Sequence, residues 1–389
     1  MLAALFNTTM KNFVQHLKND AVLYSAMLLA FTSTIVVRPS LETMREAIDW
    51  RVLSLLFCLM AVVSAFRKYN VLDVIAVSLL RKCRNTRSLY ITLISLVFFI
   101  SMTVTNDVAL LTFVPLTLII CSRAGIPSAL LIIFETIAAN LGSCVTPMGN
   151  PQNLFLYSFY NMSAGTFFSH TLLIGIPSFI LLAVCIFVVT NKKEGGQNNI
   201  TIDHISLQNP VKIGITTAVL IVILCSVFRI FDYTISLGIT VVFLLIFERS
   251  IITKIDYSLL LTFVGFFIFT NNLAQVEVIS SFLERMLETS FSVYVSGISI
   301  SQIISNVPAS LLLSGFTSQA ESLLLGVNVG GLGSLIASLA SVISYKLYNA
   351  SQEKQEKGKR SYLSFFTFWN AVFIIVLLPL VWLLKILFI

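Results

Sequence analysis

Apolar runs long enough to cross a lipid bilayer recur from one end of this chain to the other. Clear examples lie at positions 21–37, 171–189 and 366–389. An α-helix needs about 20 apolar residues to cross the hydrocarbon core, where only helices or closed barrels satisfy every backbone polar group. Of the 389 residues, 57% are hydrophobic and 11% are charged, which is too little charge for the surface of a soluble protein. The sequence therefore predicts an all-α polytopic membrane protein.

The basic residues indicate how these helices are oriented. If the N-terminus is inside and the spans alternate, 19 of the 25 Lys and Arg residues fall on the inner side. The net charge of +7 is then an orientation signal, and no nucleic-acid partner is expected. The first twenty residues lack a cleavage-like site and are interpreted as an amphipathic lead-in to the first span. We expect a multi-pass protein of the plasma membrane with a cytoplasmic N-terminus.

The two halves of the chain share three short motifs in the same order. The motifs pair residues 48–56 with 255–263, 104–107 with 304–307, and 140–147 with 328–335. In the alternating topology the first motif lies outside in one copy and inside in the other, so the copies run in opposite directions. Inverted-topology repeats are typical of secondary transporters, whose sites lie where the repeats meet.

This repeat divides the chain into four parts. We expect residues 1–47 to form a lead-in and the first transmembrane helix, 48–190 the first repeat, 191–254 a linker and two connecting transmembrane helices, and 255–389 the second repeat.

Each copy places a polar tip inside an apolar region. In the first copy, residues 105–107 separate two apolar arms whose far ends are both basic and therefore both expected inside. Two full spans with an outer tip would also fit by length, at about 1.5 Å per residue. The second copy favours the other interpretation, because residues 305–307 interrupt an apolar run in the same way. We predict re-entrant helical hairpins over 88–122 and 291–317.

Each copy also contains a glycine-rich helix break, within broken helices predicted at 127–160 and 319–348. Half-helix C-termini offer carbonyl groups to a small cation, and half-helix N-termini offer positive dipole ends to an anion. No Lys or Arg lies in the tips or breaks, so binding would depend on amides and hydroxyls. The predicted substrate and ion site comprises Thr105, Asn106, Asp107, Asn140, Gly142, Thr146, Gly149, Asn150, Asn153, Ser305, Asn306, Val307, Asn328, Gly330, Gly331 and Ser334.

Several of these residues also have a structural interpretation. Asn106 and Asn306 could cap the half-helices that follow them, although their duplicated placement favours contact with a ligand. Asp107 could interact with the helix macrodipole, or it could bind a coupling ion or proton, because a carboxylate at membrane depth is costly. Glu135, shortly before the first break, is a second coupling candidate.

The sequence predicts no cofactor and no catalytic residue, and a sodium ion at the helix breaks is the one ion expected. His16, His170 and His204 lie far apart and make no metal-ligand pattern. The six cysteines are scattered and are interpreted as small hydrophobic residues.

Three segments together resemble the ion-transporter superfamily: "ETIAANLGSCVTPMGNPQNLFL" (135–156), "TNDVALLTFVPL" (105–116) and "SNVPA" (305–309). That group includes divalent anion–sodium symporters, arsenite-efflux permeases and a sodium–proton antiporter branch. The resemblance covers roughly residues 48–386. It implies a transport domain of hairpins and broken helices that slides like an elevator against a scaffold, and it implies a homodimer.

The resemblance differs between the branches. Dicarboxylate symporters are similar in carrying Ser-Asn-Thr at both tips, and here the Asn and the preceding hydroxyl residue match. The arsenite and antiporter branches tend to have Gly-Asp-Pro where this chain has Gly149-Asn150-Pro151. The branch, and with it the substrate, stays open at this point.

These observations predict a secondary active transporter that moves a small anion, for instance a carboxylate, coupled to sodium or protons. The alternatives are a cation/proton antiporter with Asp107 and Glu135 as its acids, an oxyanion efflux permease, and an ion channel. An enzyme is not expected, because metalloprotease, hydrolase and nucleotide-binding signatures are absent from the sequence.

Overall fold

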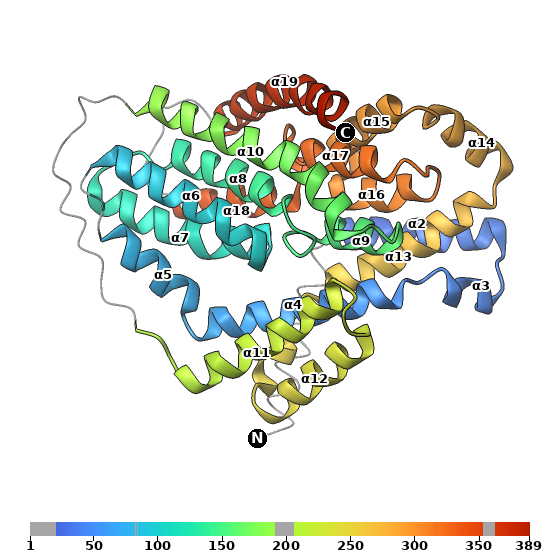
Figure 1. Cartoon of the computed structure of the whole chain (residues 1–389), viewed down its shortest axis with the longest axis horizontal. Helices are drawn as coiled ribbons and strands as arrows, with labels where there is room; N and C mark the ends of the chain where they lie inside the picture. The colour runs from blue at the N-terminus through green and yellow to red at the C-terminus, as the bar shows by residue number, and fades with distance from the viewer. Residues whose placement is uncertain (1–20, 82, 84, 191–205, 353–361) are drawn as a thin grey trace. The chain divides into compact units, whose positions relative to one another are not determined.

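The computed structural model describes residues 21–81, 83, 85–190, 206–352 and 362–389. Within these ranges the chain consists of α-helices and short 3₁₀ helices, with no strand (Figure 1). The predicted lead-in at 1–20 and residues 191–205 of the predicted linker lie outside the described residues. The all-α prediction is confirmed.

Seven helices in the described part of the chain are long and apolar enough to cross a membrane. They are Trp50–Lys68, Thr86–Val104, Asn106–Ala124, Ala164–Val189, Pro210–Val227, Tyr257–Ala274 and Tyr362–Phe388. The protein is therefore a multi-pass membrane protein, as the apolar runs predicted.

The chain forms two compact units, each built from separate stretches of sequence. Unit 1 takes residues 1–66, 209–288 and 311–318, and unit 2 takes residues 67–208, 289–310 and 319–389. Unit 1 contains α2 (Ala21–Val37), α3 (Leu41–Glu46), most of α4 (Trp50–Lys68), α11 (Pro210–Val227), α12 (Tyr233–Ile246), η1 (Arg249–Lys254), α13 (Tyr257–Ala274), α14 (Glu277–Met286) and the end of α16 (Asn306–Ser314).

Unit 2 contains the remaining elements. They are α5 (Val71–Leu80), α6 (Thr86–Val104), α7 (Asn106–Ala124), α8 (Ala129–Ser143), α9 (Pro151–Phe159), α10 (Ala164–Val189), α15 (Ser290–Ile304), the start of α16, α17 (Ala320–Gly330), η2 (Leu335–Ala337), α18 (Leu339–Gln352) and α19 (Tyr362–Phe388). Both predicted hairpin tips and both predicted helix breaks belong to this unit. The division of the sequence into two repeats stays a prediction.

Small residues bring α2 and α13 close together in unit 1. A Cβ atom added to Gly265 would lie 3.1 Å from the backbone of Ala26, so the two backbones approach closely. Near one end of this contact the Asn272 amide donates to Ser33 Oγ at 3.1 Å. Close packing and a hydrogen bond between side chains thus hold two helices that lipid alone would not drive together.

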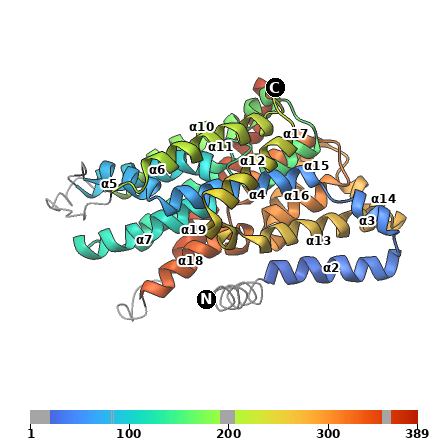
Figure 2. The same cartoon turned by 90° about the horizontal axis from the view of Figure 1, so that it is seen from below.

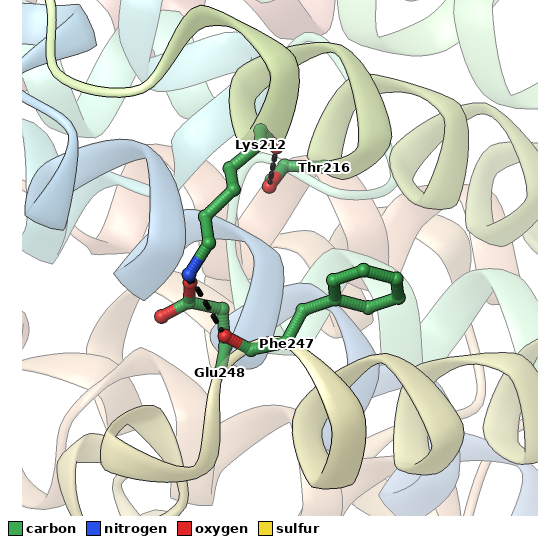
Figure 3. Close-up of polar contacts among 4 residues, drawn as sticks. All are labelled: Lys212, Thr216, Phe247 and Glu248. Carbon is green, nitrogen blue, oxygen red and sulfur yellow. Dashed lines mark hydrogen bonds and ion pairs between the residues drawn. The ribbon is translucent and has the colours of Figure 1, made fainter.

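An ion pair joins α11 to Glu248, two residues after the end of α12 in unit 1 (Figure 3). Lys212 Nζ lies 2.8 Å from Glu248 Oε1 and donates to the Phe247 carbonyl at 3.1 Å. The Glu248 side chain is 0% exposed, and a buried carboxylate needs such a partner. Thr216 Oγ1 donates to the Lys212 carbonyl one turn further along α11. We assign this group a structural role.

Helix α8 forms the core of unit 2. All of its residues from Leu131 to Ser143 are buried. It packs against α6, α7, α10, α17, α18 and α19, and Figure 1 shows α10 above it and α6 below. Helix α18 lies along α7 (Figure 2). A helix that is apolar on all sides belongs in such a core, and here polar residues enter only near its middle and its C-terminal end.

Glycines set the closest helix contact in each half of the sequence. A Cβ atom on Gly142 of α8 would lie 2.1 Å from the Phe98 carbonyl oxygen of α6. A Cβ atom on Gly326 of α17 would lie 2.4 Å from the Tyr294 carbonyl oxygen of α15. Thus α6 packs on α8 as α15 packs on α17, and in each pair the first helix leads into a polar tip.

Candidate functional site

The first tip is a single strained residue between two helices. Thr105 has φ 74° and ψ 150°, which ends α6 and lets α7 begin at Asn106. The Asn106 backbone N–H donates to the Gly149 carbonyl at 3.2 Å. From the other side, Thr146 Oγ1 donates to the Met102 carbonyl of α6. The first tip is therefore bound to the first helix break.

The second tip has the same backbone conformation. Ser305 has φ 77° and ψ 152°, between α15 and α16. Its hydroxyl donates to the Ala337 carbonyl at 3.4 Å. Asn306 is buried, and its Nδ2 lies 2.8 Å from where a Cβ atom on Gly331 would be. The second tip thus lies against the second break, and Val307 continues into α16 as a buried apolar side chain.

The first break separates α8 from α9. Asn150 is the N-cap of α9, accepting from the Asn153 backbone N–H at 2.9 Å, and Pro151 occupies the first turn. The Asn153 amide turns back and donates to the carbonyls of Cys144 and Thr146, at 2.9 and 3.1 Å. These bonds satisfy carbonyl groups left open where α8 ends.

The second break is held by a residue that the sequence reasoning missed. Gln302 Nε2 donates to the carbonyls of Gly330 and Leu332, both at 2.9 Å, and Gln302 Oε1 accepts from the Ser334 backbone N–H at 2.8 Å. Ser334 also donates through its hydroxyl to the Gln302 carbonyl. The sequence contained one signal for this role: Gln302 is the one amide residue in an arm that otherwise consists mainly of apolar and hydroxyl residues, and it lies just before the Ser305 tip.

Asn140 connects the first tip to the second break. Its Oδ1 accepts from Asn106 Nδ2 at 3.1 Å and from Ser338 Oγ at 2.9 Å. Its Nδ2 donates to the Gly331 carbonyl at 3.4 Å and to Ser341 Oγ at 3.3 Å. Ser338 was a candidate lining residue from the sequence, whereas Ser341 was not among the predicted site residues. Every polar atom of the Asn140 side chain is therefore used inside unit 2.

Asn328 makes the reciprocal connection from α17 to the first break. Its Nδ2 donates to Asn153 Oδ1 at 2.7 Å, and its Oδ1 accepts from Asn150 Nδ2 at 3.3 Å. Its Nδ2 also donates to the Leu324 carbonyl. Asn140 and Asn328 together join both breaks and the first tip through neutral side chains.

The two acidic candidates lie in different places. Asp107 lies in the first turn of α7, partly buried, beside the tip network. Glu135 lies in the middle of α8, is 0% exposed, and accepts a hydrogen bond from Thr117 of α7. Residues 107 and 117 are about 15 Å apart along a helix. The structure therefore does not bring Glu135 into direct contact with the tip.

No cluster of three or more His, Cys, Asp and Glu residues that could hold a metal occurs in the part of the chain described. His16 and His204 lie outside that part. All six cysteines are free thiols, five of them buried. The polar groups of the site are amides, hydroxyls and carbonyls, which are ligands for hard ions and hydrogen-bonding solutes.

Comparison with known proteins identifies the family. Residues 21–322 match the citrate transporter family, CitMHS. The chain belongs to this family. The resemblance predicted from the tip and break motifs is thereby confirmed, and the protein is a membrane transporter.

Two relatives of this CitMHS chain match most of its length. An uncharacterized transporter of Methanocaldococcus jannaschii is 34% identical over 294 residues, which cover 75% of this chain and 79% of that protein. The inner membrane protein YbiR of Escherichia coli is 28% identical over 331 residues, which cover 84% of this chain and 87% of that protein.

A solved structure has a similar fold. The Alcanivorax borkumensis YdaH transporter, described as having an unusual topology, superposes with a TM-score of 0.55 at 12% sequence identity. The match covers 88% of this CitMHS chain and 86% of that chain. It supports the fold alone, a helical transporter fold that extends over nearly the whole molecule.

Proposed function

We propose that this CitMHS chain is a secondary active transporter that moves a small carboxylate anion across the plasma membrane, coupled to sodium or protons. The citrate transporter family supports a substrate with several carboxylate groups. The observation that carries the proposal is the joining of both breaks and the first tip by Asn140 and Asn328 within one compact unit. The proposed substrate and ion site comprises the predicted tip and break residues.

Neutral donors suit an anion that must be bound and then released. Helices α7, α9 and α16 begin at the tips and at the first break, and the helix dipole favours negative charge at their N-termini. No Lys or Arg lies in residues 105–107, 140–153, 305–307 or 328–334, so no fixed positive charge would hold the anion too tightly. Each carboxylate would be bound by amides and hydroxyls.

The coupling ion requires oxygen ligands or a titratable group, and the proposed site has both. Carbonyl groups at the ends of α8 and α17 and the side-chain oxygens nearby suit sodium. Asp107 beside the first tip and Glu135 in α8 are the candidates for a coupling carboxyl group. A sodium ion at the breaks remains the expected ion, and no other cofactor is proposed.

Alternating access is proposed to follow an elevator mechanism. All segments that carry the site belong to unit 2 except the end of α16, which supports movement of unit 2 as one body. Unit 1 would be the scaffold. We also propose that the protein is a homodimer whose N-termini are cytoplasmic.

The test is uptake into proteoliposomes containing the purified protein. Labelled citrate, succinate and arsenite are offered with and without an inward sodium gradient or an acid-outside pH gradient. We expect a carboxylate to accumulate above equilibrium when one of the gradients is present. Uptake that only equilibrates would indicate a channel, and accumulation of arsenite alone would indicate an oxyanion permease.

A matched variant separates site effects from general damage. Asn306→Ala removes a buried amide at the second tip. Asn272→Ala removes a buried amide in unit 1, outside the proposed site. Loss of uptake in the first variant, with uptake retained in the second, supports the site. Equal loss in both would contradict it.

A further inference from the structure

A fully buried carboxyl group lies in the middle of α8. Glu135 is 0% exposed, and its Oε1 accepts a hydrogen bond from Thr117 Oγ1 of α7. Its Oε2 is buried and has no hydrogen-bond partner among the described residues. Tyr362 at the start of α19 interacts electrostatically with Glu135, and its side chain is buried.

No positive charge compensates this carboxyl group. The titratable groups facing Glu135 are the Cys121 thiol of α7 and the Tyr362 hydroxyl of α19. Within the described residues, no charged side chain or histidine of a helix packed against α8 forms an ion pair with Glu135. These side chains are Arg87, Asp107, Arg123, His170, Glu321, Lys346 and Lys385.

An ionised carboxylate in this position would destabilise the folded protein. A carboxylate buried in apolar surroundings without a cation costs several kcal/mol, ~3 or more, and a single hydroxyl donor offsets little of it. Protonation removes the charge and turns Oε2 into a hydroxyl group. Burial, the absence of a counter-ion and the empty Oε2 all favour a bound proton in this conformation.

Hydroxyl groups of the α8–α18 contact, which begins at the residue after Glu135, extend toward the second break. Thr136, the next residue, donates to Ser344 Oγ of α18 at 2.8 Å. Ser344 Oγ donates to the Ser341 carbonyl at 3.1 Å. Ser341 Oγ in turn accepts from Asn140, which is bonded to Gly331 and to the first tip. The α8–α18 contact that starts beside Glu135 in sequence thus shares Ser341 and Asn140 with the tip network.

We propose that Glu135 is a proton-binding site, and that the Thr136–Ser344–Ser341–Asn140 series transmits its protonation to the proposed substrate site. This inference rests on the proposed function for its coupling role. The step is a proton transfer alone: an O–H bond of a hydronium ion from the acidic side breaks as an O–H bond forms on the Glu135 carboxylate, and that bond later breaks as the proton passes to water on the other side. Loss of the proton leaves a charge that the packing of α7, α8 and α19 cannot hold, and the α8–α18 contact must then rearrange.

Infrared difference spectroscopy of the reconstituted protein tests the proton site without any substrate. Spectra recorded across a pH titration should contain the carbonyl stretch of a protonated carboxyl group at neutral pH. Glu135→Gln should remove this band, and Asp107→Asn should leave it. Absence of the band from the wild type at neutral pH overturns the proposal even if the variant does not fold, as does its persistence in Glu135→Gln.

Transport measurements test the coupling. In Glu135→Gln the dependence of carboxylate uptake on external pH should be lost, while binding of citrate at fixed pH is retained. An unchanged pH dependence overturns the coupling role. If wild type takes up no carboxylate while the infrared band titrates as expected, the proposed function fails and the proton site stands.

Discussion

The two hairpin tips have the same backbone and different side-chain environments. Thr105 and Ser305 have nearly identical dihedral angles, φ 74° and ψ 150° against φ 77° and ψ 152°. In each, an asparagine follows as the first residue of the next helix. The first asparagine donates to Asn140, whereas the Nδ2 of Asn306 donates no hydrogen bond to another described residue. After the asparagine comes Asp107 in the first tip and Val307 in the second.

This difference indicates a division of roles between equivalent positions. Asn106 has an internal partner and helps to hold the first tip on the first break and on Asn140. The amide of Asn306 keeps its hydrogen-bonding capacity for another group, and Val307 adds no charge beside it. We therefore expect the first tip to fix the geometry and carry the charge, and the second tip to contact the ligand through its amide.

The largest effect is expected from a methyl group at the first break. A Cβ atom on Gly149 would lie 2.1 Å from the Ser143 carbonyl oxygen, which is backbone. On Gly331 it would instead meet the Asn306 side-chain amide at 2.8 Å, which can shift. Gly149→Ala should destabilise the protein by at least the ~1–3 kcal/mol of overpacking, and Gly331→Ala by less.

The measurement is thermal unfolding of both variants in the same detergent. Equal loss of stability would mean that the second break, where Gly331 faces the Asn306 amide, is as rigid as the first. The expected difference between the two halves of the site would then be wrong.

The asparagines themselves should separate stability from transport. Asn106→Ala removes one of the two hydrogen bonds that Asn140 Oδ1 accepts and should cost about 0.5–1.5 kcal/mol in stability. Asn306→Ala should leave the unfolding temperature nearly unchanged. It should raise the half-saturating concentration of the transported carboxylate about tenfold to a hundredfold, the range for one lost contact. Unfolding curves and uptake kinetics on the same preparations provide both readings. Wild-type uptake in Asn306→Ala would reduce that residue to a packing role.

The charge at the first tip is tested by Asp107→Asn. Asn is nearly as good as Asp near helix N-termini, so the variant should stay folded and lose only the carboxylate. We expect a smaller effect on uptake than for Asn306→Ala, seen as a flattened dependence on sodium concentration. Asp107→Glu, which keeps a carboxylate at the first tip, is the control. Superimposable sodium curves for wild type and Asp107→Asn would leave Asp107 a helix-stabilising residue.

The smallest effect on the protein is expected from cysteine labelling at the hairpin ends, where Arg123, Glu288 and Ser318 are exposed and Arg87 is partly buried. Cysteines replacing Arg87 and Arg123 should both react with a membrane-impermeant reagent from the inside, and cysteines replacing Glu288 and Ser318 from the outside. Uptake should stay near wild type in each variant. Labelling of one pair from opposite sides would show that the segment between them crosses the membrane an odd number of times, so the hairpin and the inverted repeat would both fail.

The sequence by itself determined where helices start and stop. Apolar runs of membrane length predicted the helices. Asn150 with Pro151 is a local sequence signal for the start of α9, because a cap and a proline act through local backbone geometry. The polar residues at 105–107 and 305–307 indicated the two tips, which the structure has at Thr105 and Ser305. Helical hydrogen bonds join residues close in sequence, so patterns in sequence report them well.

Only the tertiary structure decided which polar groups meet. Asn150 and Asn328 are 178 residues apart in sequence, and Asn140 and Ser338 are 198 apart. The roles of Gln302 and Ser341, and the isolation of Glu135 from the tips, follow from how α8, α15, α17 and α18 pack. A side-chain hydrogen bond between distant helices depends on distances of a few tenths of an ångström, set by contacts such as Gly142 on Phe98. No local pattern encodes those distances, because many side chains share in setting them.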